Sequence, residues 1–162
     1  MTSRFLTAGL VASLCLAAPA SARLGDTAAV LRERFGAPET QPNKHTSAWL
    51  IEAPAGALVY TVTFDEKGAS IAEGLKPYRF ARILEQTARD FIDNQLSALG
   101  DPSKVRIVKA GERYQFDGEA FTCGPKEQVW VDEAANFLLI WIKGEEGSVM
   151  AVTREMLRAT RR

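Results

Sequence analysis

His45 and Cys123 are the two side chains of this sequence whose types could form a nucleophilic pair. A thiolate beside an imidazole is the arrangement that a thiol enzyme needs. No local signature surrounds either residue, so the pattern favours a solvated loop histidine and an inert strand thiol. A small hydrolase or thiol enzyme that uses Cys123 and His45 stays open as an alternative.

Three pairs of adjacent acidic residues are the other groups that could bind a metal or act as acids, and each pair falls in a predicted turn. Turn side chains are solvated and adjacent residues diverge, which favours solubility over a weak calcium site or a glycosidase acid pair. One histidine and one cysteine cannot form a zinc site, and no Walker or Gly-x-Ser-x-Gly pattern is present. We therefore expect no catalytic residue, metal site or cofactor, and a protein that is not an enzyme. The pairs are Asp65-Glu66, Asp132-Glu133 and Glu145-Glu146.

The aromatic residues of two neighbouring predicted strands are more informative. Trp130 shares a strand face with the polar residues Gln128 and Asp132, which indicates that its indole points away from the core. Phe137 and Trp141 lie on one face of the next strand, and aliphatic residues fill the other. A sheet that is apolar on both faces needs a second cover, either its own helix or a partner. The candidate partner-binding surface is Trp130, Trp141 and Phe137, with the two indoles together and accessible.

The composition describes an ordinary soluble globular protein. The chain has 162 residues, of which 46% are apolar and 25% charged, and twenty basic side chains balance twenty acidic ones. This balance shows no basic excess that would point to nucleic acid or to an anionic membrane. We expect the partner to be a protein or a component of the cell envelope.

The first 22 residues have the layout of an export signal. One basic residue, Arg4, precedes an apolar run over residues 5–18, and small residues lead up to Ala22. The run is shorter than the about 20 apolar residues that cross a bilayer. We therefore expect cleavage after Ala22, export to the periplasm or the medium, and no transmembrane segment in the mature chain. An uncleaved anchor is the alternative, and a lipid anchor at Cys15 is disfavoured because Leu14 is not a small residue.

Removal of this leader, residues 1–22, leaves Cys123 as the cysteine of the mature chain, so no internal disulfide can form. Residues 23–162 must then be held together by their core, as a single exported domain. The favoured interpretation of Cys123 is a half-buried strand thiol, and a disulfide between two chains is the alternative.

Local patterns predict the elements that position these residues. A short helix begins after Asp26-Thr27, either of which can cap it, and ends at Gly36. The widest apolar stripe predicts a second helix over residues 80–99 that ends at Gly100. Residues 39–46 are predicted to be a loop, and residues 154–162 a short helix or tail. Strands are predicted over residues 47–52, 57–64, around Ile71, and over 105–109, 113–117, 119–123, 127–132, 136–143 and 148–153. Short connections favour an α+β fold, in which helices pack on one face of an antiparallel meander sheet and leave the other face free to bind.

The two halves of the mature chain, residues 23–75 and 76–153, share an order of helix, proline-containing end, loop and strands. A tandem duplication of a helix-plus-meander unit would leave such an order, and coincidence among common turn residues is the alternative. The residues that match are Phe35 to Pro38 with Leu99 to Pro102, Trp49 with Tyr114, and Asp65-Glu66 with Asp132-Glu133.

The start of the mature chain resembles a known kind of exported domain. Leu24-Gly25-Asp26-Thr27, followed by Val30-Leu31 and Phe35-Gly36-Ala37-Pro38, is similar to the opening of small bacterial domains of the outer-membrane SmpA/OmlA type. Such domains share a helix-then-meander unit with the beta-lactamase inhibitor protein, which carries it twice. The resemblance implies an exported protein that works by binding other proteins, and it supplies no catalytic residue.

These patterns together predict an exported, noncatalytic binding module that recognises a protein or an envelope component. Two alternatives come from other classes: the enzyme described above, and a carrier that holds a small ligand between the second helix and the sheet.

Overall fold

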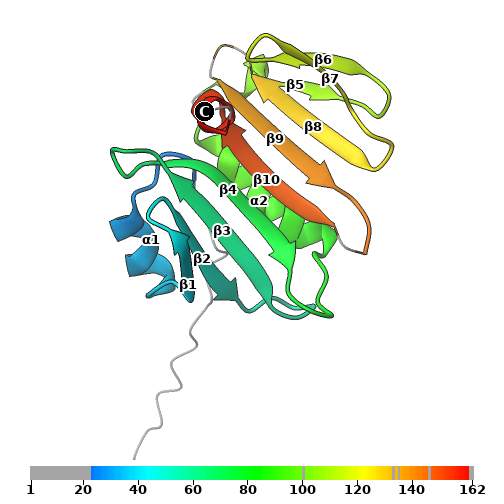
Figure 1. The fold of residues 1–162 in the computed structure, drawn as a ribbon. Helices are drawn as coiled ribbons and strands as arrows, with labels where there is room; N and C mark the ends of the chain where they lie inside the picture. Colours follow the sequence, from blue (N-terminus) through cyan, green and yellow to red (C-terminus); the bar gives the residue numbers. More distant parts are fainter. Residues whose placement is uncertain (1–22, 100, 133, 135, 146, 161–162) are drawn as a thin grey trace, which may run out of the picture.

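The computed structural model describes residues 23–99, 101–132, 134, 136–145 and 147–160, and its main feature is an eight-stranded antiparallel sheet (Figure 1). The strand order is β1-β2-β3-β4-β10-β9-β8-β5, and β6 and β7 form a separate hairpin. This confirms the predicted α+β fold with an antiparallel sheet. The strands are β1 (Thr40–Asn43), β2 (Thr46–Ile51), β3 (Leu58–Phe64), β4 (Ser70–Pro77), β5 (Arg106–Val108), β6 (Arg113–Phe116), β7 (Glu119–Thr122), β8 (Glu127–Asp132), β9 (Phe137–Ile142) and β10 (Ser148–Thr153). The helices are α1 (Ala28–Phe35), α2 (Glu85–Ser97), α3 (Arg154–Ala159) and the 3-10 helix η1 (Pro102–Lys104).

The sheet consists of two halves that meet at β4 and β10. Strands β1 to β4 follow α1 as one antiparallel meander, and β5, β8, β9 and β10 follow α2 as another. The last strands of the two halves, β4 and β10, pair antiparallel at the centre. This repeated order is the one that a duplicated unit would have, and duplication stays a prediction.

Two of the residue matches behind the predicted repeat are wrong. Trp49 lies on β2, whereas Tyr114 lies on β6 in the hairpin outside the main sheet. Asp65 lies between β3 and β4, whereas Asp132 ends β8, which pairs with β9 and not with β10. The β6–β7 hairpin is inserted between β5 and β8 and shifts the second half relative to the first.

Helix α1 forms where the sequence predicts it, for the expected reasons. The Thr27 side chain caps the helix by accepting a hydrogen bond from the Val30 amide at 3.4 Å. Gly36 ends it with a φ of +79°, and its amide donates to the Arg32 carbonyl oxygen. Leu31, the fully buried residue of α1, points into the core.

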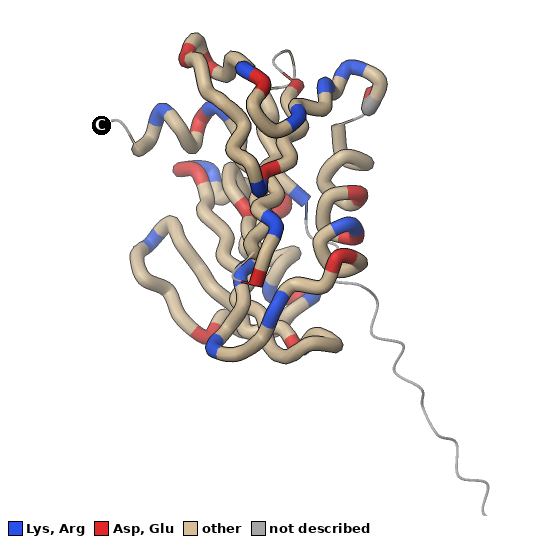
Figure 2. Tube along the Cα trace, turned by 90° about the vertical axis from the view of Figure 1, so that its right-hand side faces the viewer, with Lys and Arg blue, Asp and Glu red and all other residues tan. Residues whose placement is uncertain are grey.

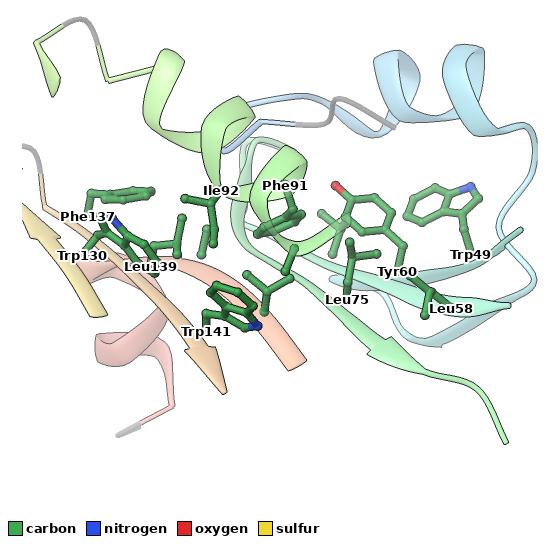
Figure 3. Packing of buried hydrophobic residues seen from close by; sticks show 14 of the residues in the cluster. Trp49, Leu58, Tyr60, Leu75, Phe91, Ile92, Trp130, Phe137, Leu139 and Trp141 are labelled. Carbon is green, nitrogen blue, oxygen red and sulfur yellow. The ribbon is translucent and has the colours of Figure 1, made fainter. Parts of the chain in front are cut away.

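The main core lies between one face of the sheet and the helices α1 and α2. Phe91 and Ile92 of α2 point toward aromatic and aliphatic side chains of β4 and β9, and Trp49 and Tyr60 continue the same layer on β2 and β3 (Figure 3). Along β3 the buried and half-buried residues alternate, as predicted. Its buried residues are Leu58, Tyr60, Val62 and Phe64.

A second, smaller core lies on the opposite face, over β8 and β9. Val129, Val131 and Leu138 point to this face, where residues of the β6–β7 hairpin cover them and Leu157 of α3 packs against the same cluster. Figure 2 views the sheet from its edge and shows α2 and the C-terminal α3 on opposite sides. This face is therefore covered at the β8 end and is not left free over its whole length.

Asp117 connects the hairpin to α3. It occupies the two-residue turn between β6 and β7 with a φ of +52°, followed by Gly118 at +79°, as the predicted Asp-Gly turn requires. Its carboxylate is 7% exposed and forms ion pairs with Arg154 at 3.2 Å and Arg158 at 3.0 Å.

The structure corrects the predicted second helix and the predicted first loop. Helix α2 begins at Glu85 and not at Phe80, because residues 78–84 form a turn and an extended segment in which Phe80 is fully exposed. Residues 40–43, predicted to be a loop, form the exposed strand β1. This strand is at the edge of the sheet, and an edge strand tolerates a proline such as Pro42, which has no N–H to donate.

No helix in the described part of the chain is long and apolar enough to cross a membrane. The predicted leader, residues 1–22, and the predicted helix end at Gly100 lie outside the described residues. The same holds for Glu133 and Glu146, the second members of two predicted acidic pairs.

Candidate functional site

The predicted aromatic surface is buried, which corrects the exposure expected of Trp130, Trp141 and Phe137. Their exposed fractions are 8%, 8% and 2%, and all three belong to the main core. The strand register puts Trp130 opposite Leu139, so that both tryptophans lie on the face that α2 covers. The protein's own helix thus fills the place that a partner would have taken (Figure 3).

His45 and Cys123, the candidates for a thiol enzyme, lie in different parts of the fold. His45 lines a cavity formed with the β3–β4 turn and α3, and Cys123 is not among its lining residues. Cys123 is 1% exposed, and its thiol donates weak hydrogen bonds to the carbonyl oxygens of Glu127 at 3.5 Å and Val108 at 3.7 Å. Burial raises the pKa of Cys123, which favours the thiol over the nucleophilic thiolate.

The described members of the acidic pairs lie in separate parts of the fold. The Asp65 carboxylate accepts hydrogen bonds from the amides of Lys67 and Ala69, both at 2.9 Å, and so organises the β3–β4 turn. Asp132, predicted to be solvated, is 5% exposed at the end of β8. Within the described ranges, no three His, Cys, Asp or Glu side chains are placed to hold a metal ion.

A buried polar cluster lies where β3, β4, α2 and the segment around Leu24 meet. The Glu73 carboxylate accepts hydrogen bonds of 2.7 Å from the Ser70 hydroxyl and from the Gln95 amide. Gln95 in turn accepts a hydrogen bond from the Leu24 amide at 3.0 Å. The Tyr60 hydroxyl is buried beside the same carboxylate without a hydrogen bond of normal geometry.

Loss of solvation is the dominant effect on this cluster. Burial raises the pKa of Glu73 above 4.5, although hydrogen bonds from the surrounding side chains lower it. Burial also raises the pKa of Tyr60, and the neighbouring Glu73 adds to this rise. The cluster is closed to solvent and joins α2 to β4 and to Leu24, so its role is structural.

Among the residues that the structure describes, the most exposed large apolar side chain is that of Phe80, in a turn between β4 and α2. The Ala81 amide donates to the Tyr78 carbonyl oxygen at 3.1 Å and closes this turn. The Tyr78 amide donates to the Ala57 carbonyl oxygen at 3.1 Å, and the Arg82 amide donates to the Ala55 carbonyl oxygen at 3.4 Å. These backbone hydrogen bonds connect the turn to residues 53–57. The backbone therefore presents Phe80 outward from a fixed position.

Two backbone features show how closely this turn is built. Arg79 has a φ of +56°, a left-handed conformation that non-glycine residues rarely adopt. Gly56 has a φ of +103°, and a Cβ atom on it would lie 2.8 Å from the Cβ atom of Ala81. A glycine is thus required for residues 53–57 to approach the Phe80 turn.

Basic side chains surround Phe80. The Arg79 guanidinium lies 4.9 Å from the centroid of the Tyr78 ring, and Lys76 and Arg82 flank the same turn. These residues line an open cavity of about 600 Å³ whose acidic lining residue is Glu145. We call Lys76 and residues 78–84 the Phe80 site.

A smaller cavity of about 220 Å³ adjoins the start of α2, between Ile83, Trp141 and the β9–β10 turn. Lys143 lies above Trp141 here, with its ammonium 4.7 Å from the ring centroid. The rest of the contact between α2 and the sheet is filled by core side chains. Lys143 is thus a further basic residue beside the Phe80 site, because it lines the same cavity as Ile83.

The sequence analysis missed the Phe80 site because its apolar residues have helical spacing and were assigned to the predicted second helix. Phe80, Ile83 and Leu84 fit the apolar stripe of α2, and so they were expected in the core. The signal that could have found the site is the run Tyr78-Arg79-Phe80, in which aromatic and basic residues are adjacent in the chain, as they often are on binding surfaces.

Comparisons with known proteins assign no family. No protein-family model and no curated protein match the chain. Among solved structures, the crystal structure of a DUF4309 family protein (YjgB) from Bacillus subtilis subsp. subtilis str. 168 covers 85% of each chain at 11% identity and a TM-score of 0.41.

Proposed function

We propose that this protein is an exported, noncatalytic binding module that contacts an envelope component or a protein through the Phe80 site. The observation that carries the proposal is Phe80 itself, a large apolar side chain that is fully exposed on a hydrogen-bonded turn. A folded protein gains nothing from holding an aromatic ring in water, whereas aromatic and arginine residues often anchor binding partners.

The neighbouring residues support the same function. Tyr78 and Leu84 are also exposed, at 37% and 38%, so three of the large exposed apolar residues fall within seven positions of the chain. Arg79 and Arg82 offer hydrogen bonds to anionic groups on a partner. Because the turn is fixed, binding would cost little loss of conformational entropy.

The reactive residues of the chain favour binding over chemistry. Cys123 is buried with a raised pKa, and His45 lies at a separate cavity. A histidine-activated thiolate would need the two groups within hydrogen-bond reach. The carboxylate of Glu73 is 2% exposed and is held by hydrogen bonds from Ser70 and Gln95.

Photo-crosslinking in intact cells tests this function. A photoreactive residue replaces Phe80 in one protein and Ile107, an apolar residue that is 53% exposed on edge strand β5, in a matched control. We expect adducts with an envelope component from position 80 and none from position 107. No adduct at position 80, or the same adducts at both positions, would contradict the proposal.

A double variant separates binding from the enzyme alternative. Cys123→Ala with His45→Ala should retain the adducts from position 80 and the physiological effect of the protein. If the double variant stays folded but loses that effect, the protein acts by chemistry and the proposed function is wrong.

A further inference from the structure

We infer that the Phe80 site docks on the surface of an anionic phospholipid bilayer, an inference that rests on the proposed function and names its partner. The chemistry that points there is a fully exposed phenyl ring with basic side chains around it. An amphipathic surface of this kind binds where apolar acyl chains lie beneath a layer of phosphate groups.

The shape of the site favours a bilayer over a protein. Phe80 is fully exposed on a hydrogen-bonded turn, and the cavity that it helps to line is otherwise lined largely by charged residues, among them Lys76, Arg79 and Arg82. A protein partner would have to supply a preformed apolar pocket for the ring, whereas a fluid bilayer closes around any side chain that enters it. Tyr78, half exposed beneath Arg79, has the amphipathic character of aromatic residues at membrane interfaces.

The charges of the site are complementary to such a surface. Lys76, Arg79, Arg82 and Lys143 lie at or beside it, against Glu145 in the same cavity. Glu85, at the start of α2, is paired with Arg89 on the helix surface. The equal numbers of acidic and basic residues in the whole chain hide this local excess, because a total count averages over the surface.

Sedimentation with vesicles tests the inference on the mature protein, residues 23–162. The probes are phosphatidylcholine vesicles with and without about one third phosphatidylglycerol, at low and high salt. We expect binding to the anionic vesicles that weakens as salt rises, since screening reduces the attraction of exposed charges. Phe80→Ala should weaken binding about tenfold, and the double change Arg79→Gln with Arg82→Gln by a similar factor or more.

Matched control variants show whether the loss of vesicle binding is specific to the Phe80 site. Ile107→Ala removes an exposed apolar residue elsewhere, and Arg106→Gln with Lys109→Gln removes two exposed basic residues from the region of β5. Both should bind the anionic vesicles as the unchanged protein does. Thermal unfolding of each variant shows whether the body stays folded.

The possible outcomes distinguish a failure of the lipid inference from a failure of the proposed function. Absence of vesicle binding together with a protein adduct at position 80 would overturn the lipid surface and leave a protein-binding module. Absence of both would overturn the proposed function as well. Binding that Phe80→Ala leaves unchanged would also overturn the inference, because the bilayer would then contact another surface.

Discussion

At the scale of single residues, Phe80 and Glu73 each stand where their chemistry is unfavourable. Phe80 exposes an apolar ring to water, which forgoes the about 1.5–3 kcal/mol that burial of such a side chain provides. Glu73 buries a carboxyl group that accepts its hydrogen bonds from Ser70 and Gln95, beside Tyr60, and not from a basic side chain. We propose that a partner covers Phe80, and we attribute the burial of Glu73 to the hydrogen bonds that join β4 to α2.

The pH dependence of stability tests the account of Glu73. Its pKa is higher in the folded protein than the 4.5 of an exposed glutamate, so its contribution to stability is full below about pH 4.5 and is lost as the pH rises through the folded value. Urea unfolding should therefore show the wild type losing stability relative to Glu73→Gln between pH 4.5 and neutrality. A difference that stays constant or changes in the opposite direction would contradict the raised pKa.

At the scale of elements, the Phe80 turn depends on residues 53–57 behind it. Gly56→Ala would place a methyl group 2.8 Å from the Cβ atom of Ala81 and so displace the turn. We expect faster tryptic cleavage after Arg79 and Arg82 in this variant. Gly68→Ala is the control, because Gly68 has a similar positive φ of +81° but nothing within 4 Å of a new Cβ atom. Equal cleavage of the two variants would mean that the contact with Ala81 does not hold the turn.

The β6–β7 hairpin should be the element most easily detached from the body. Asp117→Asn keeps a residue that tolerates the left-handed turn but removes the charge that pairs with Arg154 and Arg158. We expect the hairpin amides to exchange with deuterium several-fold faster and the amides of β3 and β4 to stay protected. Asp101→Asn, at a carboxylate that is half exposed, should leave the hairpin unchanged. Uniform acceleration over the whole sheet would show that the hairpin unfolds only with the rest.

Element prediction succeeded where one local signal acted alone. The cap at Thr27, the end at Gly36 and the alternation in β3 define their elements without help from distant residues. The predicted start of α2 was wrong because the spacing of apolar residues does not show which backbone hydrogen bonds form. Phe80 has the spacing of a core residue, but the turn that places it depends on Ala55 and Ala57, far earlier in the chain.

At the scale of the whole molecule, the sequence predicted which aromatic residues share a face but not what covers that face. Trp141 and Phe137 do share a face of β9, as their alternation indicates. Nothing in a strand pattern tells whether α2 or a partner lies above it. The binding surface was consequently expected on the sheet, and the structure exposes a loop at the end of the sheet instead.

The mature amino terminus provides a test of export. After cleavage behind Ala22, the new ammonium group of Arg23 would lie beside the Asp26 carboxylate, which accepts from the Arg23 nitrogen at 3.1 Å and is paired with Arg34 at 3.0 Å. The contacts of Leu24 would be kept. Intact mass of the protein recovered outside the cytoplasm should equal that of residues 23–162. A mass that includes the leader would contradict cleavage.

The most direct test of the Phe80 site is a solvent-sensitive fluorophore attached through Phe80→Cys, compared with one attached through Ile107→Cys. The native thiol of Cys123 is 1% exposed, so labelling of the folded protein is selective. On addition of envelope fractions, we expect a blue shift and brighter emission from position 80 and no change from position 107. Water-like emission from position 80, with or without a shift at position 107, would contradict the assignment of the binding surface.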